Sequence, residues 1–135
     1  MQWVGQFVGH RRWGRNHLGI TVPDCLNLFI TCGPGTVLGH GGSYITIAEC
    51  QVRYIVDLIG TMAREGLGAM ECKPEVEQDY VRRHDDAHSR MIWTHDGMDN
   101  WYRNNAGRVV TGSVVGGGLL GRYRDPCRTA VTAVP

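Results

Sequence analysis

A glycine-rich stretch between an apolar segment and a long amphipathic pattern is the feature that most constrains this chain. Residues 27–32 read NLFITC, residues 33–42 read GPGTVLGHGG, and a helical pattern begins at about residue 43. The continuous apolar run favours a short strand buried on both faces, as in a parallel sheet. A strand that leads through glycines to a helix N-terminus can hold a polar or anionic ligand with main-chain N–H groups.

The following residues supply further elements of an α/β unit. A long helix is predicted from Gly42 or Ser43 to Gly66, with Ser43 as its N-cap. Its expected core-facing stripe repeats at three- and four-residue spacing and consists of Ile45, Ala48, Val52, Ile55, Ile59 and Met62. Residues 69–72 are expected to form a short strand.

A second helix is predicted after this strand. Pro74 sits where helices favour proline, at the first position, and the pattern runs to about Trp93. Its expected apolar stripe consists of Val76, Tyr80, His84, Ala87 and Met91. Residues 107–111 are a candidate strand. Trp101 and Tyr102 before it favour packing over the alternative, the lining of a substrate pocket.

Length and composition limit the partners that we expect. The 135 residues suffice for one domain, expected over 19–111, between an irregular lead-in at 1–18 and an irregular glycine-rich tail at 112–135. The 14 Lys and Arg residues nearly balance 13 Asp and Glu, which argues against nucleic acid or an anionic membrane as a partner. No apolar run reaches the ~18 residues that crossing a membrane requires. Five cysteines without a CxxC pair favour reduced thiols and a cytoplasmic location.

The spacing of the glycines does not identify a ligand. The stretch GPGTVLGHGG lacks the G-x-G-x-x-G of a dinucleotide fingerprint and the Gly-Lys-Ser/Thr of a P-loop. On spacing alone, a ligand-binding loop and a ligand-free connection between strand and helix therefore both remain open.

A longer part of the chain resembles a known enzyme family. Residues 22–59, which read VPDCLNLFITCGPGTVLGHGGSYITIAECQVRYIVDLI, resemble flavoprotein monooxygenases of the Baeyer–Villiger type, particularly those acting on hydroxyacetophenone-like aryl ketones. The resemblance continues through ECKPEVEQDYVRRHDDAHSRMIW to DNWYRNNAGRV and covers about residues 18–110. Such enzymes have two dinucleotide-binding domains, for FAD and NADPH. The resemblance implies that this chain is a C-terminal segment, where the polypeptide returns to the FAD domain.

The resemblance also assigns the glycine loop a place beside the flavin ring. In the family, the Gly-Pro loop and the helix N-terminus after it face the flavin, where main-chain N–H groups can bond its pyrimidine edge. The implied FAD-binding residues of this sequence are Gly33, Pro34, Gly35, Thr36, Val37 and Leu38. The family's loop commonly reads Gly-Pro-Asn-Thr-Asn-Leu. Gly35 and Val37 replace the two Asn, so a contact through those side chains is lost here.

The activity that the resemblance implies is that of a complete parent enzyme, which uses FAD, NADPH and O2 to insert one oxygen atom into a ketone. In the residues that carry the resemblance, no G-x-G-x-x-G motif follows a predicted strand, and the sequence identifies no catalytic side chain. Residues 2–17 and 111–135 depart from the family's pattern. We therefore expect a truncated or frame-shifted segment that is inactive and does not retain FAD by itself. The sequence determines neither the substrate nor the oligomeric state.

Two functions from other classes remain open. The sequence HDDAH places His84 and His88 four residues apart on one helix face, with Asp85 where H-E-x-x-H zinc proteases have their glutamate base. A zinc hydrolase would need a third ligand that nothing marks, and a buried structural histidine is the commoner outcome, so no metal ligand is assigned. The other alternative is a small non-catalytic module that uses the glycine loop to bind a nucleotide or a protein.

Overall fold

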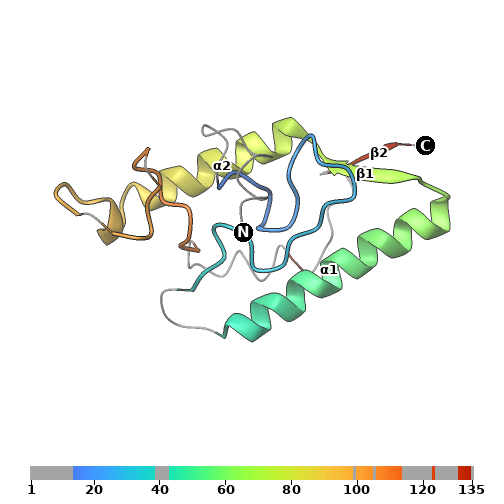
Figure 1. The fold of residues 1–135 in the computed structure, drawn as a ribbon, viewed down its shortest axis with the longest axis horizontal. Coiled ribbons are helices and arrows are strands. Elements are labelled where there is room, and N and C mark those ends of the chain that lie inside the picture. The colour runs from blue at the N-terminus through green and yellow to red at the C-terminus, as the bar shows by residue number, and fades with distance from the viewer. Residues whose placement is uncertain are drawn as a thin grey trace, which may run out of the picture.

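The computed structural model describes residues 14–38, 43–98, 100–104, 106–113, 123 and 131–134. In these ranges the elements follow in the order α1 (Tyr44–Glu65), β1 (Ala69–Cys72), α2 (Pro74–His88), the 3-10 turn η1 (Ile92–Thr94) and β2 (Val131–Val134). In Figure 1 the irregular segment 14–38 lies between the two long helices, and the two strands lie beyond it at one end of the molecule. Helix, strand and irregular backbone thus combine in one mixed unit.

Helix α1 confirms the long helix that the sequence predicts, but its buried face differs. It begins after Ser43 and ends at Gly66, whose left-handed φ of 66° lets its N–H bond the Met62 carbonyl. The face toward the core consists of Ile47, Gln51, Tyr54, Leu58 and Thr61. The stripe expected to face the core is instead half-buried or exposed, with Ile45 at 69% and Ile59 at 48%.

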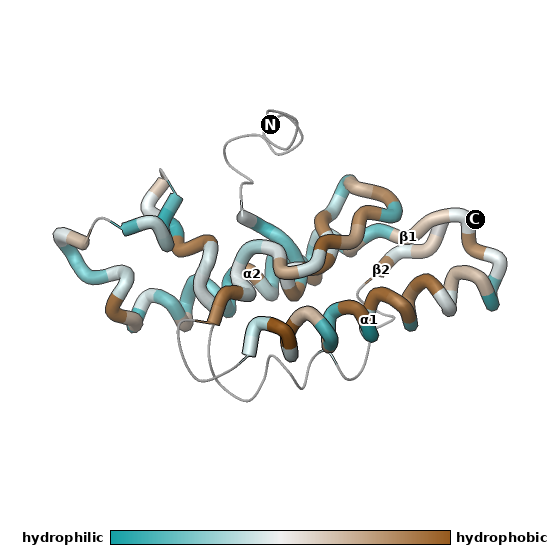
Figure 2. The backbone as a smooth tube through the Cα atoms, turned by 60° about the horizontal axis from the view of Figure 1, so that its bottom comes forward, coloured by the Kyte–Doolittle hydropathy of each residue, from teal (hydrophilic) through white to brown (hydrophobic). Residues whose placement is uncertain are grey.

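Apolar residues occur on both sides of α1, which is why periodicity selected the wrong face. Figure 2 shows hydrophobic positions recurring along the whole helix. Gln51 is fully buried because its side-chain amide bonds backbone groups of segment 14–38, accepting from Cys32 N–H at 2.7 Å and donating to Leu18 O at 3.1 Å. A buried amide with these partners satisfies its polar atoms, so a polar residue marks the core side of the helix.

Strand β1 is confirmed where the sequence predicts it, and its partner lies where an irregular tail was expected. The two strands pair antiparallel, from Ala69 opposite Val134 to Cys72 opposite Val131. The irregular tail predicted for 112–135 is therefore wrong for 131–134. This pairing joins segments about 60 residues apart, and a pattern confined to four residues does not reveal such a partner.

Helix α2 begins as predicted and ends earlier. Pro74 occupies its first turn together with Glu75 and Glu77, and the helix stops at His88 rather than near Trp93. The hydroxyl of Thr94 donates to the His88 and Met91 carbonyls at 2.9 and 2.7 Å. The carbonyl of His88, the last residue of α2, is thereby satisfied, and residues 92–94 form η1 instead of a further α-turn.

The strand expected at residues 27–32 does not form. Asn27 and Cys32 both adopt left-handed backbone, with φ of 55° each, and Leu26 and Leu28 are 55% and 42% exposed. Asn27 instead joins β1, because its N–H donates to Met70 O at 2.9 Å and its side-chain oxygen accepts from Met70 N–H. The candidate strand at 107–111 is likewise reduced to one bridge, between Arg103 and Val109.

The core lies between α1, β1 and segment 14–38. It consists of Leu18, Ile20, Ile47, Tyr54, Leu58, Met70, Tyr123 and Val131. Three of these residues lie outside the domain expected over 19–111, so parts of the lead-in and the tail pack with it; the three-part division itself stays a prediction. In the described part of the chain, no helix is both long and apolar enough to cross a bilayer.

Candidate functional site

The glycine loop, residues 33–38, is held by backbone hydrogen bonds to two other segments. The N–H of Gly33 donates to Gly19 O at 3.2 Å. Gly35 N–H donates to Val110 O at 2.9 Å, and Val37 N–H donates to Thr111 O at 3.0 Å. The Val37 carbonyl in turn accepts from Ser113 N–H at 2.8 Å. Val37 and Gly112 thus form a parallel bridge, on which the loop rests.

Two glycines of the loop are required by close contacts. A Cβ on Gly33 would lie 2.5 Å from the Gly19 carbonyl oxygen, a distance that no side chain tolerates. Gly35 has φ of +79°, and a Cβ there would lie 3.1 Å from Nε2 of His84. Glycine at these positions therefore reflects both packing against neighbouring backbone and a left-handed conformation.

Side chains of the loop and its neighbours also bond inside the protein. Thr36 is fully buried and its hydroxyl donates to Gly33 O at 2.6 Å. The amide of Asn16 donates to Pro34 O at 3.0 Å, and its oxygen accepts from Gly19 N–H at 2.5 Å. The Thr36 hydroxyl is thus committed to the loop itself.

These hydrogen bonds limit which of the six candidate residues can donate a main-chain N–H to a ligand. Pro34 has no N–H, and the N–H groups of Gly33, Gly35 and Val37 donate to carbonyls within the chain. Because Val37 directs its N–H and C=O toward residues 111–113, the N–H of Leu38 points to the opposite side of the backbone. Within the described residues, no carbonyl accepts a hydrogen bond from Leu38 N–H. The same holds for the Thr36 N–H, but Thr36 is fully buried whereas Leu38 is half-buried, so Leu38 is the candidate donor of the loop for a ligand.

The start of α1 supplies further open donors. The first intrahelical bond runs from Ile47 N–H to Ser43 O at 3.3 Å, so the amides of the preceding turn have no helical acceptor. The Ser43 side chain makes no capping bond, and the first turn carries no acidic residue. This positive helix end favours a polar or anionic group. Residues 39–42, which were also expected near the ligand, lie outside the described residues.

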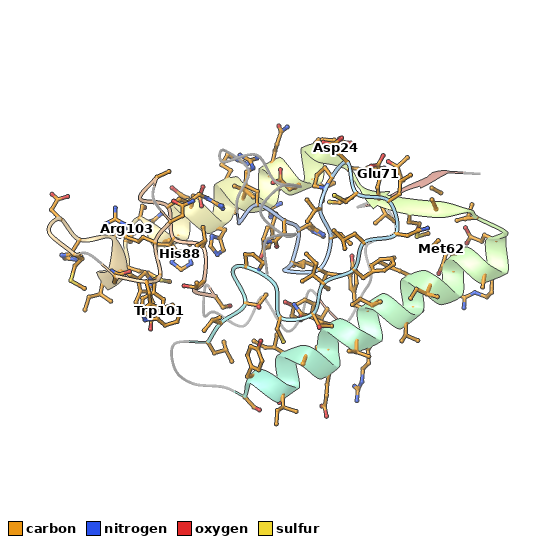
Figure 3. All side chains as sticks on the ribbon, in the orientation of Figure 1. Asp24, Met62, Glu71, His88, Trp101 and Arg103 are labelled. Atoms are coloured by element: carbon orange, nitrogen blue, oxygen red, sulfur yellow. The ribbon has the colours of Figure 1, made fainter. Side chains whose placement is uncertain are left out.

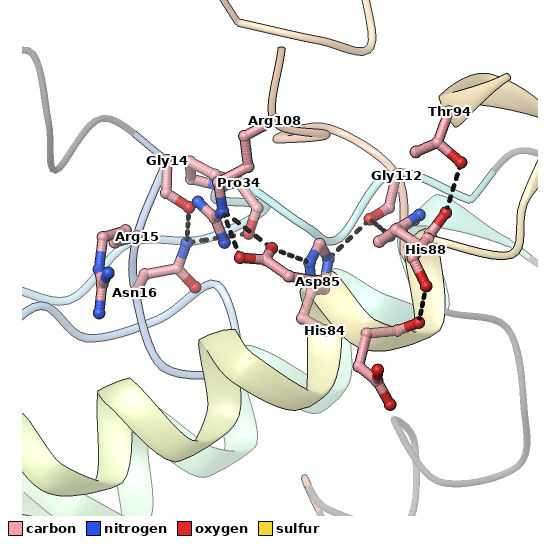
Figure 4. A network of polar contacts seen from close by, with 12 residues as sticks. Gly14, Arg15, Asn16, Pro34, His84, Asp85, His88, Thr94, Arg108 and Gly112 are labelled. Carbon is pink, nitrogen blue, oxygen red and sulfur yellow. Dashed lines mark hydrogen bonds and ion pairs between the residues drawn. The ribbon is translucent and has the colours of Figure 1, made fainter. Parts of the chain in front are cut away.

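Two histidines of α2 contact Gly112, the residue that is bridged to Val37 of the loop. Nε2 of His84 and Nε2 of His88 lie 3.1 and 3.0 Å from one acceptor, the carbonyl oxygen of Gly112 (Figure 4). Trp93 Nε1–H donates to His88 Nδ1 at 3.1 Å. Burial and the neighbouring His84 lower the pKa of His88 to about 4, so it is neutral at pH 7.

The carboxylate of Asp85 pairs with the guanidinium group of Arg108. Arg108 Nε lies 2.8 and 3.0 Å from the two carboxylate oxygens. Burial alone would raise the pKa of Asp85, but the interactions with His84 and Arg108 hold that pKa below its ordinary value. The arrangement differs from that of the alternative zinc site, because both Nε2 atoms contact a carbonyl and the carboxylate is paired. Within the described residues, no three His, Cys, Asp or Glu side chains come together as metal ligands.

An aromatic stack adjoins this histidine pair. Figure 3 shows His88 at the end of α2 that faces the segment carrying Trp101 and Arg103. The rings of Trp101 and Tyr102 stack with centroids 4.2 Å apart, and Tyr102 lies 5.1 Å from Trp93. Tyr102 thus packs against the indole that bonds His88, whereas Trp101 is 66% exposed, so the packing interpretation holds for Tyr102 and not for Trp101.

Sequence reasoning missed the residues that anchor the loop. Asn16 lies in the expected lead-in, Gly112 opens the expected tail, and Arg108 lies in a segment interpreted only as a candidate strand. Gln51 had one usable signal, a polar residue that recurs in register with Ile47, Tyr54 and Leu58.

Comparisons with known proteins identify relatives of the chain. No protein-family profile matches it. The uncharacterized monooxygenase y4iD of Sinorhizobium fredii is 39% identical over 97 residues, which are 72% of this chain and 15% of the relative. A Baeyer–Villiger monooxygenase of Pseudomonas aeruginosa is 33% identical over 84 residues, which are 62% of this chain and 16% of that enzyme. The chain is homologous to a segment of Baeyer–Villiger-type monooxygenases.

The fold of this monooxygenase segment also occurs in solved structures. Oxidized steroid monooxygenase bound to NADP matches with a TM-score of 0.70 at 20% identity, over 89% of this chain and 23% of that one. A cyclohexanone monooxygenase mutant from Rhodococcus sp. Phi1 bound to NADP+ matches with a TM-score of 0.65 at 23% identity, over 88% and 22%. These matches confirm the expected fold class, a part of a flavin monooxygenase. The segment spans about one sixth of the curated relatives' length.

Proposed function

We propose that this chain supplies the loop and helix beside the flavin ring of a FAD- and NADPH-dependent monooxygenase that inserts one oxygen atom from O2 into a ketone. The observation that carries the proposal is the N–H of half-buried Leu38, which has no acceptor among the described residues, on a loop where Gly33, Gly35 and Val37 bond within the chain, together with the start of α1, whose N-cap side chain makes no bond. When bound, FAD supplies the chemistry with O2, using electrons from NADPH.

The role of the chain's own residues is to bind and orient. Leu38 N–H and the first-turn amides of α1 donate to the polar pyrimidine edge of the ring. The positive end of α1 stabilises negative charge at that edge. Gly33 and Gly35 permit the tight turn that presents Leu38, and the chain contributes no side chain to which a catalytic step is assigned. The residues present therefore fit the flavin through main-chain groups.

The outer face of α1 supports a place within a larger protein. Ile45, Val52, Val56 and Ile59 lie on one side of the helix and are exposed, Val56 at 61%. A helix that is apolar on two opposite sides is buried on both in folded proteins. Because the homologous enzymes are about six times longer than the matched segment, we assign this face to the remainder of a monooxygenase chain.

A chimaera tests the proposal directly. Residues 14–113, which include the anchors Asn16 and Gly112, replace the matching segment of the full-length Pseudomonas enzyme. The chimaera is expected to retain FAD after gel filtration and to oxidise NADPH in a ketone-dependent manner. As a control, the same enzyme carries a Gly/Ser linker in place of the segment and is expected to lose FAD. A folded chimaera that binds no FAD would contradict the proposal.

A further inference from the structure

The two histidines of α2 share one acceptor. A carbonyl oxygen only accepts hydrogen bonds, so His84 and His88 must each carry a proton on Nε2 to bond Gly112 O at 3.1 and 3.0 Å. His88 Nδ1 accepts from the indole N–H of Trp93, which fixes the neutral Nε2–H tautomer of that ring. The ring centroids lie 4.3 Å apart, so the imidazoles converge on one point of the backbone.

Gly112 lies in the segment 111–113, whose backbone hydrogen bonds to Val37 hold the glycine loop. Gly112 is bridged to Val37, with Thr111 accepting from Val37 N–H and Ser113 donating to Val37 O. Both histidine rings also contact glycines that leave no room for a side chain. A Cβ on Gly35 would lie 3.1 Å from His84 Nε2, and one on Gly112 would lie 3.1 Å from His88 Cε1.

We propose that His84 and His88 are positioning residues of the glycine loop, because their Nε2–H groups hold the Gly112 carbonyl and thereby fix the direction of the Leu38 N–H. The inference deepens the proposed function. It is tested on the chain without flavin, however, so either can fail while the other holds. Replacement of a histidine by glutamine preserves an N–H donor at the position of Nε2, whereas leucine preserves only the bulk.

The first test measures amide hydrogen exchange by NMR on the full 135-residue chain. His84→Leu and His88→Leu are expected to speed exchange at Val37 and Ser113 about tenfold, as for the loss of one hydrogen bond, and to leave Leu58 of α1 unchanged. His84→Gln and His88→Gln are expected to restore slow exchange. Unchanged rates at Val37 and Ser113 in the leucine variants would overturn the proposal. Equal acceleration at Leu58 would also overturn it, since it would indicate a general packing role.

The second test needs no variant and so does not depend on how one folds. Long-range nitrogen–proton correlation spectra of the unsubstituted chain at pH 7 report which ring nitrogen of each histidine is protonated. His88 is expected as the neutral Nε2–H tautomer, and Nε2 of His84 is expected to carry a proton. An unprotonated Nε2 on either ring would overturn the shared bond to Gly112.

Discussion

The side-chain oxygen of Gln51 accepts a 2.7 Å hydrogen bond from the backbone N–H of Cys32, the residue directly before the glycine loop. The amide nitrogen of the same side chain donates to Leu18 O and to the hydroxyl of Tyr123, both at 3.1 Å. One buried side chain on α1 therefore joins the loop, the lead-in and a residue of the tail. Gln51→Leu would remove the acceptor of the Cys32 N–H and one of the two donors to Leu18 O, which would keep its bond from the Tyr123 hydroxyl.

We expect Gln51→Leu to lower the free energy of unfolding by about 2–4 kcal/mol, because several buried polar groups lose their bonds at once. Urea unfolding followed by circular dichroism measures the change. Val52→Ala, one residue further along and on the exposed side, is the matched control and is expected to change stability by less than about 1 kcal/mol. Equal effects of the two substitutions would show that the Gln51 bonds contribute little.

Arg15 anchors the lead-in to α2. Its Nε and Nη2 lie 2.9 and 3.0 Å from the two oxygens of Glu77, whose side chain is 7% exposed. Arg15→Ala leaves this carboxylate buried without its cation, and we expect a loss of about 1–3 kcal/mol, less than for a fully buried pair because Arg15 is partly exposed. Arg82→Ala, which breaks an exposed pair with Asp79, is expected to cost about 0.5 kcal/mol or less. Similar losses in both variants would refute the anchoring role.

The stability of the chain is expected to rise with pH between about 4 and 6.5. The pKa of His88 is lowered to about 4, first by burial and then by His84, while Asp85 and Arg108 act on it with opposite signs. In this window the unfolded state binds more protons than the folded state, so stability falls as the pH is lowered and is constant above it. The full effect is at most about 3 kcal/mol.

Urea midpoints between pH 4 and 8 measure this dependence, and His88→Gln is expected to flatten it. Asp85 acts separately: its pKa is lowered, so its contribution is lost only below about pH 4. A slope that persists unchanged in His88→Gln would assign the titration to another group.

The outer face of α1 gives a prediction that differs between the isolated chain and the chimaera. Val56→Lys and Ile59→Lys change residues that are 61% and 48% exposed, so they are expected to leave the unfolding of the isolated chain nearly unchanged. In the chimaera the same lysines would be buried without a partner, and we expect loss of soluble, FAD-loaded protein. Retention of FAD in the double variant would contradict burial of this face.

The sequence predicted the parts of the fold that local signals control. Ser43 and Gly66 bound α1, Pro74 starts α2, and the predicted short strand at 69–72 is β1. It did not predict what depends on partners far along the chain. Residues 27–32 have strand-like composition, but their bonds go to Met70 and Gln51, and two left-handed residues break the extended run.

The candidate site shows the same limit. The resemblance pointed to residues 33–38 as a group, whereas the choice of Leu38 as the candidate donor needed the bridge between Val37 and Gly112 and the burial of Thr36. Nothing local in the sequence relates Gly112 to this loop. The sequence also did not predict the bonds of His84 and His88 to Gly112, because the histidine spacing in HDDAH is equally typical of a metal site.

The most direct measurement of the central claim is the FAD affinity of the chimaera with Leu38→Pro. Proline deletes the Leu38 N–H, and Val37, which is bridged to Gly112, has the β-type backbone that suits the residue before a proline. Loss of a hydrogen bond worth roughly 1.5–3 kcal/mol predicts FAD binding weaker by ~10–150-fold. Leu38→Ala, which keeps the N–H and removes the side chain, is expected to stay within about threefold of the parent chimaera. Equal FAD affinity in the proline and alanine variants would contradict a flavin contact through the Leu38 main chain.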